Sequence, residues 1–269
     1  MLAGKFGRYD VAKLTQVAAA LELIHMASLV HDDVIDDAAT RRGTPTVKSE
    51  WGDRMAMYTG DYIFARALVL LAEFSDVRIH QLLSESIVAM CEGEIEQIRD
   101  FYNMEQNLRT YLRRIKRKTA LLLSVSCTLG AMVAECKPRE VRLLERYGYY
   151  AGMAFQIIDD ILDLTSTPKK LGKPVGSDLR QGNLTLPVLF ALQNSRDALR
   201  LRNLIGREMT AAEVEEAVKI VKSSGGIEYA RTMADRYMEK CLEALRQLPN
   251  TDARTKLEGI AHFINERDH

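Results

Sequence analysis

Several acidic side chains lie at the end of an apolar stretch, where a buried helix would not be expected to carry unpaired carboxylates. Residues 17–30 have helical periodicity and lead directly into Asp32, Asp33 and Asp36. On a helix, Asp32 and Asp36 are i and i+4 neighbours, so their carboxylates share one face. Like charges at that spacing weaken a helix unless a cation lies between them. The sequence therefore predicts a helix that ends in a cation-binding cluster.

A second cluster repeats the pattern later in the chain. Asp159 and Asp163 again have the i, i+4 spacing, with Asp160 between them, on another largely apolar helical stretch. Two such clusters could face each other across a cavity and share metal ions. Carboxylates without accompanying His or Cys suit hard cations, chiefly Mg²⁺, which commonly takes further oxygens from substrate phosphates. We therefore expect a Mg²⁺ site at these two helix ends.

Helical periodicity also dominates the rest of the chain. Only six prolines and 16 glycines interrupt 269 residues, and no alternating run is long enough for a confident strand. No low-complexity linker divides the chain, so we expect one all-α domain. Helices are expected at about 11–37, 51–74, 77–102, 108–135 (with a break near Lys118 left open), 138–164, 184–193, 196–205, 211–223, 227–247 and 251–266.

The charge and composition of the chain bear on whether it binds nucleic acid or spans a membrane. Lys plus Arg equals Asp plus Glu at 37 each, so the net charge gives no reason to expect nucleic acid. The basic run 113–118 lacks interleaved aromatic residues and reads as a solvated face, from which Lys118 would turn inward. Four scattered cysteines indicate reduced thiols, and the uncharged run 119–134 is shorter than the roughly 20 apolar residues of a membrane span. We expect a cytoplasmic protein without a membrane span, with at most transient contact with a membrane surface.

Basic residues accompany both acidic clusters. Arg41 and Arg42 follow the first cluster, and Lys173 lies in a loop rich in Gly and Lys after the second. A solvated connection is the plain alternative for that loop, but its position favours a phosphate-binding lid. Arg can take phosphate oxygens bidentately, whereas Lys acts as a point charge. Carboxylates, Mg²⁺, Arg and Lys together indicate a diphosphate site that stabilises a leaving group.

These motifs resemble those of the trans-isoprenyl diphosphate synthases, or polyprenyl synthetases. Within that family, the chain is most similar to the catalytic components of two-component heptaprenyl and hexaprenyl diphosphate synthases. The resemblance runs from about Val11 to the C-terminus. Its matching segments are 29–36 with 41–46, 93–97, 118–120, 152–163 and 172–179.

The resemblance implies a helical bundle of the isoprenoid synthase type around a deep central cavity, with three Mg²⁺ ions. The implied metal ligands are Asp32, Asp33, Asp36, Asp159, Asp160 and Asp163. Arg41, Lys118, Thr119, Gln156 and Lys173 would hold the allylic diphosphate, and His25 and Arg42 the isopentenyl diphosphate. The implied catalytic set is Asp32, Asp36, Lys118, Gln156, Asp159 and Lys173. The implied reaction is ionisation of the allylic diphosphate, attack by the isopentenyl double bond and loss of a proton.

Product length has a physical interpretation. Ser28 and Ala27 stand four and five residues before Asp32, one turn down the predicted helix, where short-chain members of the family often carry an aromatic plug. Small residues there leave a tunnel open, although they could instead serve helix packing. We expect a medium or long product, from hexaprenyl to octaprenyl, with heptaprenyl as the best match.

Two departures from the family pattern keep alternatives open. The family has Gly-Gly-Lys-Arg-x-Arg-Pro upstream of the first motif, whereas this sequence begins just downstream of it, so residues 1–269 resemble one synthetase domain without its first helices. Asn183 also stands where many relatives have lysine. We expect a homodimer or a heterodimer with a small unlike subunit. A non-catalytic or partner-dependent subunit is the main alternative, and a terpene cyclase is a weaker one.

Overall fold

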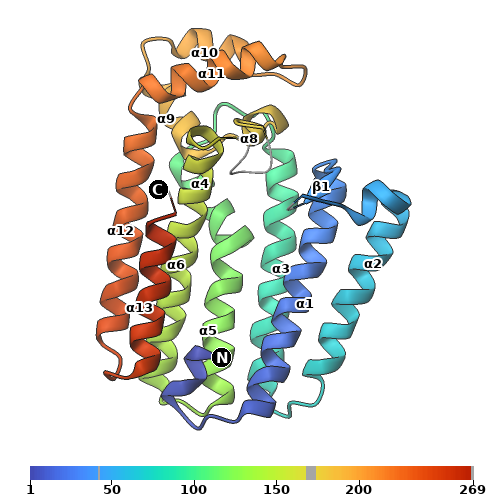
Figure 1. Ribbon diagram of the computed structural model, residues 1–269, viewed down its shortest axis with the longest axis vertical. Coiled ribbons are helices and arrows are strands. Elements are labelled where there is room, and N and C mark those ends of the chain that lie inside the picture. Colours follow the sequence, from blue (N-terminus) through green and yellow to red (C-terminus); the bar gives the residue numbers. More distant parts are fainter. Residues whose placement is uncertain (42, 168–173, 268–269) are drawn as a thin grey trace. The chain divides into compact units, whose positions relative to one another are not determined.

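The computed structural model describes residues 1–41, 43–167 and 174–267, and these residues are mostly helical (Figure 1). The all-α prediction is confirmed. The elements are η1 (Leu2–Phe6), α1 (Val11–Ile35), β1 (Thr40–Arg41), β2 (Thr44–Pro45), α2 (Val47–Leu71), α3 (Val77–Arg99), α4 (Leu108–Ile115), η2 (Lys116–Ala120), α5 (Leu121–Val133), α6 (Pro138–Thr165), α8 (Ser177–Gln181), α9 (Leu186–Asn194), α10 (Ala198–Leu204), α11 (Ala211–Ser223), α12 (Gly226–Arg246) and α13 (Asp252–Asn265).

Backbone contacts divide the chain into two compact units. Unit 1 contains Met1–Glu85 and Val125–Glu145, and unit 2 contains Ser86–Ser124 and Arg146–His269. The first aspartate cluster therefore belongs to unit 1 and the second to unit 2. The expectation of a single domain stays a prediction.

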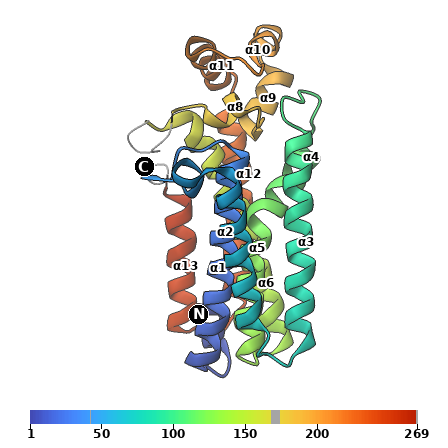
Figure 2. The ribbon, with the colours of Figure 1, turned by 90° about the vertical axis from the view of Figure 1, so that its right-hand side faces the viewer.

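In unit 1, α1 and α2 lie side by side (Figures 1 and 2). The Asp10 side chain caps the start of α1 by accepting a hydrogen bond from the backbone N–H of Lys13 at 3.2 Å. Apolar side chains at helical spacing are buried along α1, because one face of the helix packs inside the protein. These side chains are Leu14, Val17, Leu21 and Ile24. The packed stripe fixes the C-terminal end of α1, which carries Asp32 and Asp33.

Within the described residues, α1 is also the one helix long and apolar enough to cross a membrane by length and composition. The longest uncharged run of the sequence is residues 119–134, so a search for membrane spans by uncharged runs does not indicate this helix. One third of its most apolar window, 33%, is buried inside the protein, and core helices of soluble proteins pass the same test. This property is therefore only a weak indication of a membrane segment.

The predicted helices agree with the observed ones to within a few residues, and α11 spans the predicted 211–223. The predicted start of α2 was late, because Thr46 caps a turn that begins at Val47. Gly52 then interrupts this helix with φ 80° and ψ 167°, a conformation that suits glycine. The two-residue strands and α8 were not predicted, because they are too short to show a periodicity.

In unit 2, α12 lies beside α9 and α13, while α10 and α11 cross near the end of α12 (Figures 1 and 2). The buried residues of α6 around the second cluster are apolar, and Ile157, Ile158 and Ile161 are at most 2% exposed. This packing holds Asp159 and Asp160 on a rigid helix.

Glycines on α6 allow a close approach of two backbones. A Cβ atom on Gly152 would lie 2.5 Å from the Cα atom of Ala120, and one on Gly148 would lie 2.5 Å from the carbonyl oxygen of Leu123. Thr119, next to Ala120, reaches the side chain of Gln156 across this contact at 2.5 Å. The small residues of α6 therefore help to bring two predicted diphosphate-binding side chains together.

Gly152→Ala is expected to lower the free energy of unfolding by about 1 to 3 kcal/mol, because the new methyl group overpacks a backbone contact. Urea unfolding monitored by circular dichroism measures the loss. Gly259→Ala is the matched control, since nothing lies within 4 Å of a Cβ atom at that position in α13. A Gly152→Ala variant as stable as the control would contradict the close approach.

Candidate active site

The first cluster has the geometry that its spacing predicted. Asp32 lies in the last turns of α1, and Asp36 caps the helix in an α-helical conformation, with its N–H donating to the Asp32 carbonyl at 2.8 Å. Both residues are half-buried. The two residues therefore lie one turn apart at the end of α1, and neither is fully buried.

Asp33 has a different environment. It is 6% exposed, and its Oδ1 accepts a hydrogen bond from Arg41 Nε at 2.7 Å. Arg41 lies on β1, which pairs with β2 in the register Arg41↔Thr44. This charge-assisted bond fixes the side chain that was predicted to hold a diphosphate. Arg42, predicted to bind isopentenyl diphosphate, lies outside the described residues.

The residues one and two turns before the cluster lie on α1. Ala27 is 1% exposed, whereas its neighbour Met26 is 45% exposed. Ser28 is half-buried, and its Oγ donates to the carbonyl oxygen of His25 at 2.8 Å. The predicted length-determining position Ala27 is thus buried, and the roles of Ala27, Ser28 and His25 stay predictions.

In the second cluster, Asp159 is the most accessible carboxylate, with a side chain that is 45% exposed. Its Oδ1 lies 3.4 Å from a guanidinium nitrogen of Arg267. The same guanidinium stacks over the ring of Phe155, 4.4 Å from the ring centroid. No sequence pattern indicated Arg267, because it lies 108 residues away from Asp159.

Asp160 is buried in a chain of hydrogen bonds. It is 3% exposed, and its two carboxylate oxygens accept from Tyr111 Oη at 2.6 Å and from Gln156 Nε2 at 2.9 Å. Thr119 Oγ1 donates in turn to Gln156 Oε1 at 2.5 Å. Two predicted diphosphate-binding residues, Thr119 and Gln156, are therefore brought together and joined to Asp160.

Burial, together with the charge of Asp178, raises the pKa of Asp160 to about 7, against the opposing effect of the hydrogen bonds from Tyr111 and Gln156. Burial also raises the pKa of the Tyr111 hydroxyl well above its usual value. Tyr111 therefore stays protonated and donates to the carboxyl group.

The stability of the metal-free protein is expected to fall as the pH rises from about 4 to about 7. The folded chain keeps the Asp160 proton up to a pKa of about 7, whereas the unfolded chain releases it near 3.8, so folding is favoured at low pH. Asp160→Asn should flatten this part of the profile of melting temperature against pH. Parallel profiles for the two proteins would contradict the raised pKa.

Asp163 is held by the segment that begins just after residue 173. Its Oδ2 accepts from the N–H of Asp178 at 3.3 Å, and its carbonyl oxygen accepts from the N–H of Gly176 at 2.9 Å. At 1% exposed, Asp163 is less accessible than Asp159. Lys173 and the other lysines of the predicted lid lie outside the described residues.

A π-helical turn, η2, breaks the helix where the sequence left a break open, and it carries Lys118 and Thr119. Such turns occur frequently at functional sites. The Nζ atom of Lys118 lies 3.4 Å from Glu94 and from Gln97 on α3. Lys118 faces these two side chains and is half-buried.

The basic run 113–118 is not solvated throughout. Arg113 and Arg117 pair with glutamates of α3, but Arg114 is 5% exposed. Arg114 donates to Gln106 Oε1 at 2.8 Å and to the Leu184 carbonyl at 2.6 Å. The prediction of a solvated face was therefore wrong for Arg114, because buried acceptors from distant segments satisfy its guanidinium.

The carboxylates fit a metal that is completed by a substrate. Within residues 1–41, 43–167 and 174–267, no group of three or more His, Cys, Asp or Glu side chains is arranged to hold a metal ion. Mg²⁺ needs only one or two carboxylates when phosphate oxygens and water fill its octahedron. The accessible carboxylates Asp32, Asp36 and Asp159 meet that requirement.

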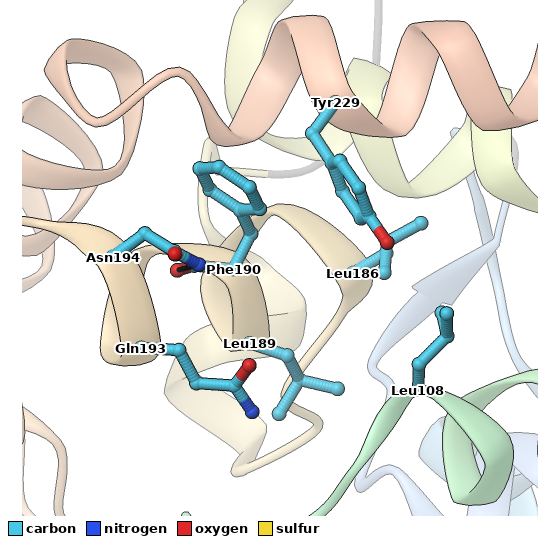
Figure 3. Close-up of a pocket in the computed structure, with 7 residues that line it drawn as sticks. All are labelled: Leu108, Leu186, Leu189, Phe190, Gln193, Asn194 and Tyr229. Carbon is cyan, nitrogen blue, oxygen red and sulfur yellow. Dashed lines mark hydrogen bonds between the residues drawn. The ribbon is translucent and has the colours of Figure 1, made fainter.

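A separate surface pocket of unit 2 has a volume of about 270 Å³ (Figure 3). The rings of Phe190 and Tyr229 stack at one side, with centroids 4.7 Å apart. None of its lining residues carries a full charge or was predicted as a site residue. The residues that line the pocket are Leu108, Leu186, Leu189, Phe190, Gln193, Asn194 and Tyr229.

Comparison with known proteins gives consistent matches. The family model described as polyprenyl synthetase matches residues 1–221. Component 2 of heptaprenyl diphosphate synthase from Bacillus subtilis is 52% identical over 267 residues, which cover 99% of this chain and 76% of that protein.

Solved structures agree with this. Heptaprenyl diphosphate synthase from Staphylococcus aureus has a TM-score of 0.96 at 42% identity, covering 100% of this chain and 85% of that one. A polyprenyl synthase from Caulobacter crescentus complexed with calcium and isoprenyl diphosphate has a TM-score of 0.93 at 33% identity, with coverage of 99% and 82%.

Proposed function

Because the chain belongs to the polyprenyl synthetase family, and is therefore a prenyltransferase, we propose that it elongates an allylic diphosphate such as farnesyl diphosphate with isopentenyl diphosphate. The observation that carries this proposal is the pair of aspartate clusters, each with basic or amide side chains beside it. In unit 1, Asp33 orients Arg41, and in unit 2, Asp160 is bonded to Gln156. Within each unit, an acidic group thus lies beside a side chain that is proposed to bind diphosphate.

The metal proposal follows from accessibility. Asp32, Asp36 and Asp159 are the carboxylates that a partly hydrated Mg²⁺ can reach, and the calcium in the Caulobacter structure supports a divalent ion. When bound, Mg²⁺ would supply charge neutralisation for the departing diphosphate. Three ions, and direct ligation by Asp33, Asp160 and Asp163, remain predictions from the resemblance.

The residues of this chain would act mainly on the diphosphate. Arg41, held by Asp33, offers a planar donor group, and Lys118 on η2 adds a positive charge. The Gln156 amide, joined to Thr119, offers a neutral donor. Arg42 and Lys173 are proposed to complete the diphosphate contacts, and His25 to contact the isopentenyl diphosphate.

These donors lower the barrier to ionisation by stabilising charge on the leaving oxygen. The allylic C–O bond breaks, the isopentenyl double bond attacks the carbocation, and one new C–C bond forms. A proton is then lost from the isopentenyl unit, and we assign its acceptor to an oxygen of the departing diphosphate. Each cycle lengthens the chain by one isoprene unit.

We propose heptaprenyl diphosphate as the product. The names of the Bacillus subtilis and Staphylococcus aureus relatives support this length. Ala27, which is small and buried one turn before Asp32, is the residue that the resemblance assigns to the length limit. The work of the enzyme is proposed to take place in the cytoplasm.

A protein partner is also proposed. After the Gly52 kink, one side of α2 exposes Tyr58 at 67% and Tyr62 at 65%, with Met55 and Val69 at helical spacing on the same side. Trp51, before the kink, is 64% exposed. Exposed apolar stripes of this kind often mark protein interfaces. The relatives named component 2 favour an unlike subunit over a second copy. The mass in solution, measured by light scattering with and without a candidate small subunit, separates the two.

Release of inorganic diphosphate tests the proposed function. The protein is mixed with farnesyl diphosphate, isopentenyl diphosphate and Mg²⁺, and release is expected only when both substrates and the ion are present. EDTA should stop the release, and excess Mg²⁺ should restore it. Release without isopentenyl diphosphate would favour ionisation without transfer, as in a cyclase. No release, even with an unlike subunit added, would favour the non-catalytic alternative.

A further inference from the structure

The second aspartate of each cluster contacts a side chain that is expected to hold a diphosphate. Asp33 accepts from Arg41 at 2.7 Å, and Asp160 accepts from Gln156 at 2.9 Å. The two aspartates are 6% and 3% exposed, and so are less accessible to a hydrated ion than Asp32 or Asp159. The second aspartate of each motif is thus buried, and each accepts a hydrogen bond from a side chain that is predicted to bind diphosphate.

The bonds around Asp160 fix the orientation of an amide group. Asp160 accepts one hydrogen bond at each of its carboxylate oxygens. Tyr111 Oη donates to Oδ2 at 2.6 Å, and the amide nitrogen of Gln156 faces Oδ1 and donates to it at 2.9 Å. The amide oxygen of Gln156 faces Thr119, whose hydroxyl donates to it at 2.5 Å.

This orientation has a consequence for an anion. The nitrogen of Gln156 carries a second hydrogen that the chain of bonds does not use. A flipped amide would instead present its oxygen, which would repel diphosphate oxygens. In this arrangement the Thr119 hydroxyl donates to the amide oxygen of Gln156 and supports the amide.

We propose that Asp160, held by Tyr111, is a positioning residue that sets the Gln156 amide so that it offers N–H to the allylic diphosphate. This role rests on the proposed prenyl transfer and differs from direct metal ligation by Asp160. Tyr111 is 0% exposed, so its hydroxyl is a fixed donor at the start of the chain of bonds. The chain of hydrogen bonds continues from Asp160 to Gln156 and ends at Thr119.

Exchanging donors and acceptors tests this role by thermal unfolding of the metal-free protein. Asp160→Asn can place an amide donor against the donating nitrogen of Gln156. Gln156→Glu places a second carboxylate against that of Asp160, so the hydrogen bond between the two side chains loses its donor. Each variant is expected to lower the melting temperature by about 2 to 6 °C. The double variant should recover most of the loss, because the new amide at position 160 then donates to the new carboxylate at position 156.

Binding of an unreactive allylic thiolodiphosphate, measured by calorimetry with saturating Mg²⁺, gives the second readout. Asp160→Asn should weaken the analogue by about tenfold, and Tyr111→Phe by about threefold. At saturating analogue, the Mg²⁺ midpoint of Asp160→Asn should stay within about twofold of wild type. Asp159→Asn, one residue away, is the matched comparison and should shift that midpoint.

Two results would overturn the positioning role. One is a double variant whose loss of melting temperature equals the sum of the two single losses. The other is an Asp160→Asn or Tyr111→Phe protein that binds the analogue as wild type does, with a Mg²⁺ midpoint shifted as in Asp159→Asn. A wild-type protein that fails to bind the analogue would contradict the proposed function itself, and this role with it.

Discussion

Replacing Asp32 or Asp159 with alanine is expected to lower the rate of Mg²⁺-dependent prenyl transfer by at least about a thousandfold. Each substitution removes an accessible carboxylate from one cluster, and with it the means of placing a cation against the diphosphate. The fold should be retained, because Asp32 is half-buried near a helix end and the Asp159 side chain is 45% exposed.

Turnover of labelled isopentenyl diphosphate over a range of Mg²⁺ concentrations measures this effect, with circular dichroism as the test of folding. Asp37→Asn is the matched control, because asparagine tolerates the left-handed backbone of this position (φ 53°). Asp37 follows the first cluster directly, but its carboxylate is exposed and pairs with Lys48. The control should keep its activity within about twofold, as surface substitutions usually do. Full activity in both Asp32→Ala and Asp159→Ala would remove the metal assignment.

Ala27→Tyr is expected to shorten the product to less than the length made by the wild-type enzyme. Ala27 is 1% exposed on α1, one turn before Asp32, so a phenol ring there must occupy interior space of the protein. A growing prenyl chain that uses this space would meet the ring. Overpacking would also cost about 1 to 3 kcal/mol of stability, so the assay needs a temperature well below the transition.

Chromatography of the dephosphorylated products measures their length. Met26→Tyr is the control, because Met26 is the adjacent residue of α1 and is 45% exposed. Its products should keep the wild-type length. Ala27→Leu gives a smaller obstruction if the tyrosine variant does not fold, and it should give an intermediate length. An unchanged product from a folded Ala27 variant would place the length limit elsewhere.

The parts of the fold and site that follow local rules could be predicted from the sequence. The helices were found because apolar residues recur at the helical period, and the Asp32 and Asp36 pair because i, i+4 neighbours share a face. The sequence allowed for a break in the helix near Lys118, and a π-helical turn lies at this position. All of these depend on residues within a few turns of one another.

The rest depends on contacts between distant residues. Tyr111 meets Asp160 across 49 positions and Arg267 meets Asp159 across 108, and neither pairing leaves a pattern in the sequence. Arg114 was read as a surface residue because arginine is rarely buried. Its acceptors, Gln106 and the carbonyl of Leu184, come from segments that only the folded chain brings together.

The most direct test of the central claim is the length of the product made from farnesyl diphosphate, labelled isopentenyl diphosphate and Mg²⁺, with EDTA in a parallel sample. The proposed function predicts a ladder of labelled prenyl diphosphates that ends at heptaprenyl and is absent with EDTA. The reaction is run both with the protein alone and with an unlike small subunit. No labelled product under either condition would contradict the assignment of the chain as an elongating enzyme.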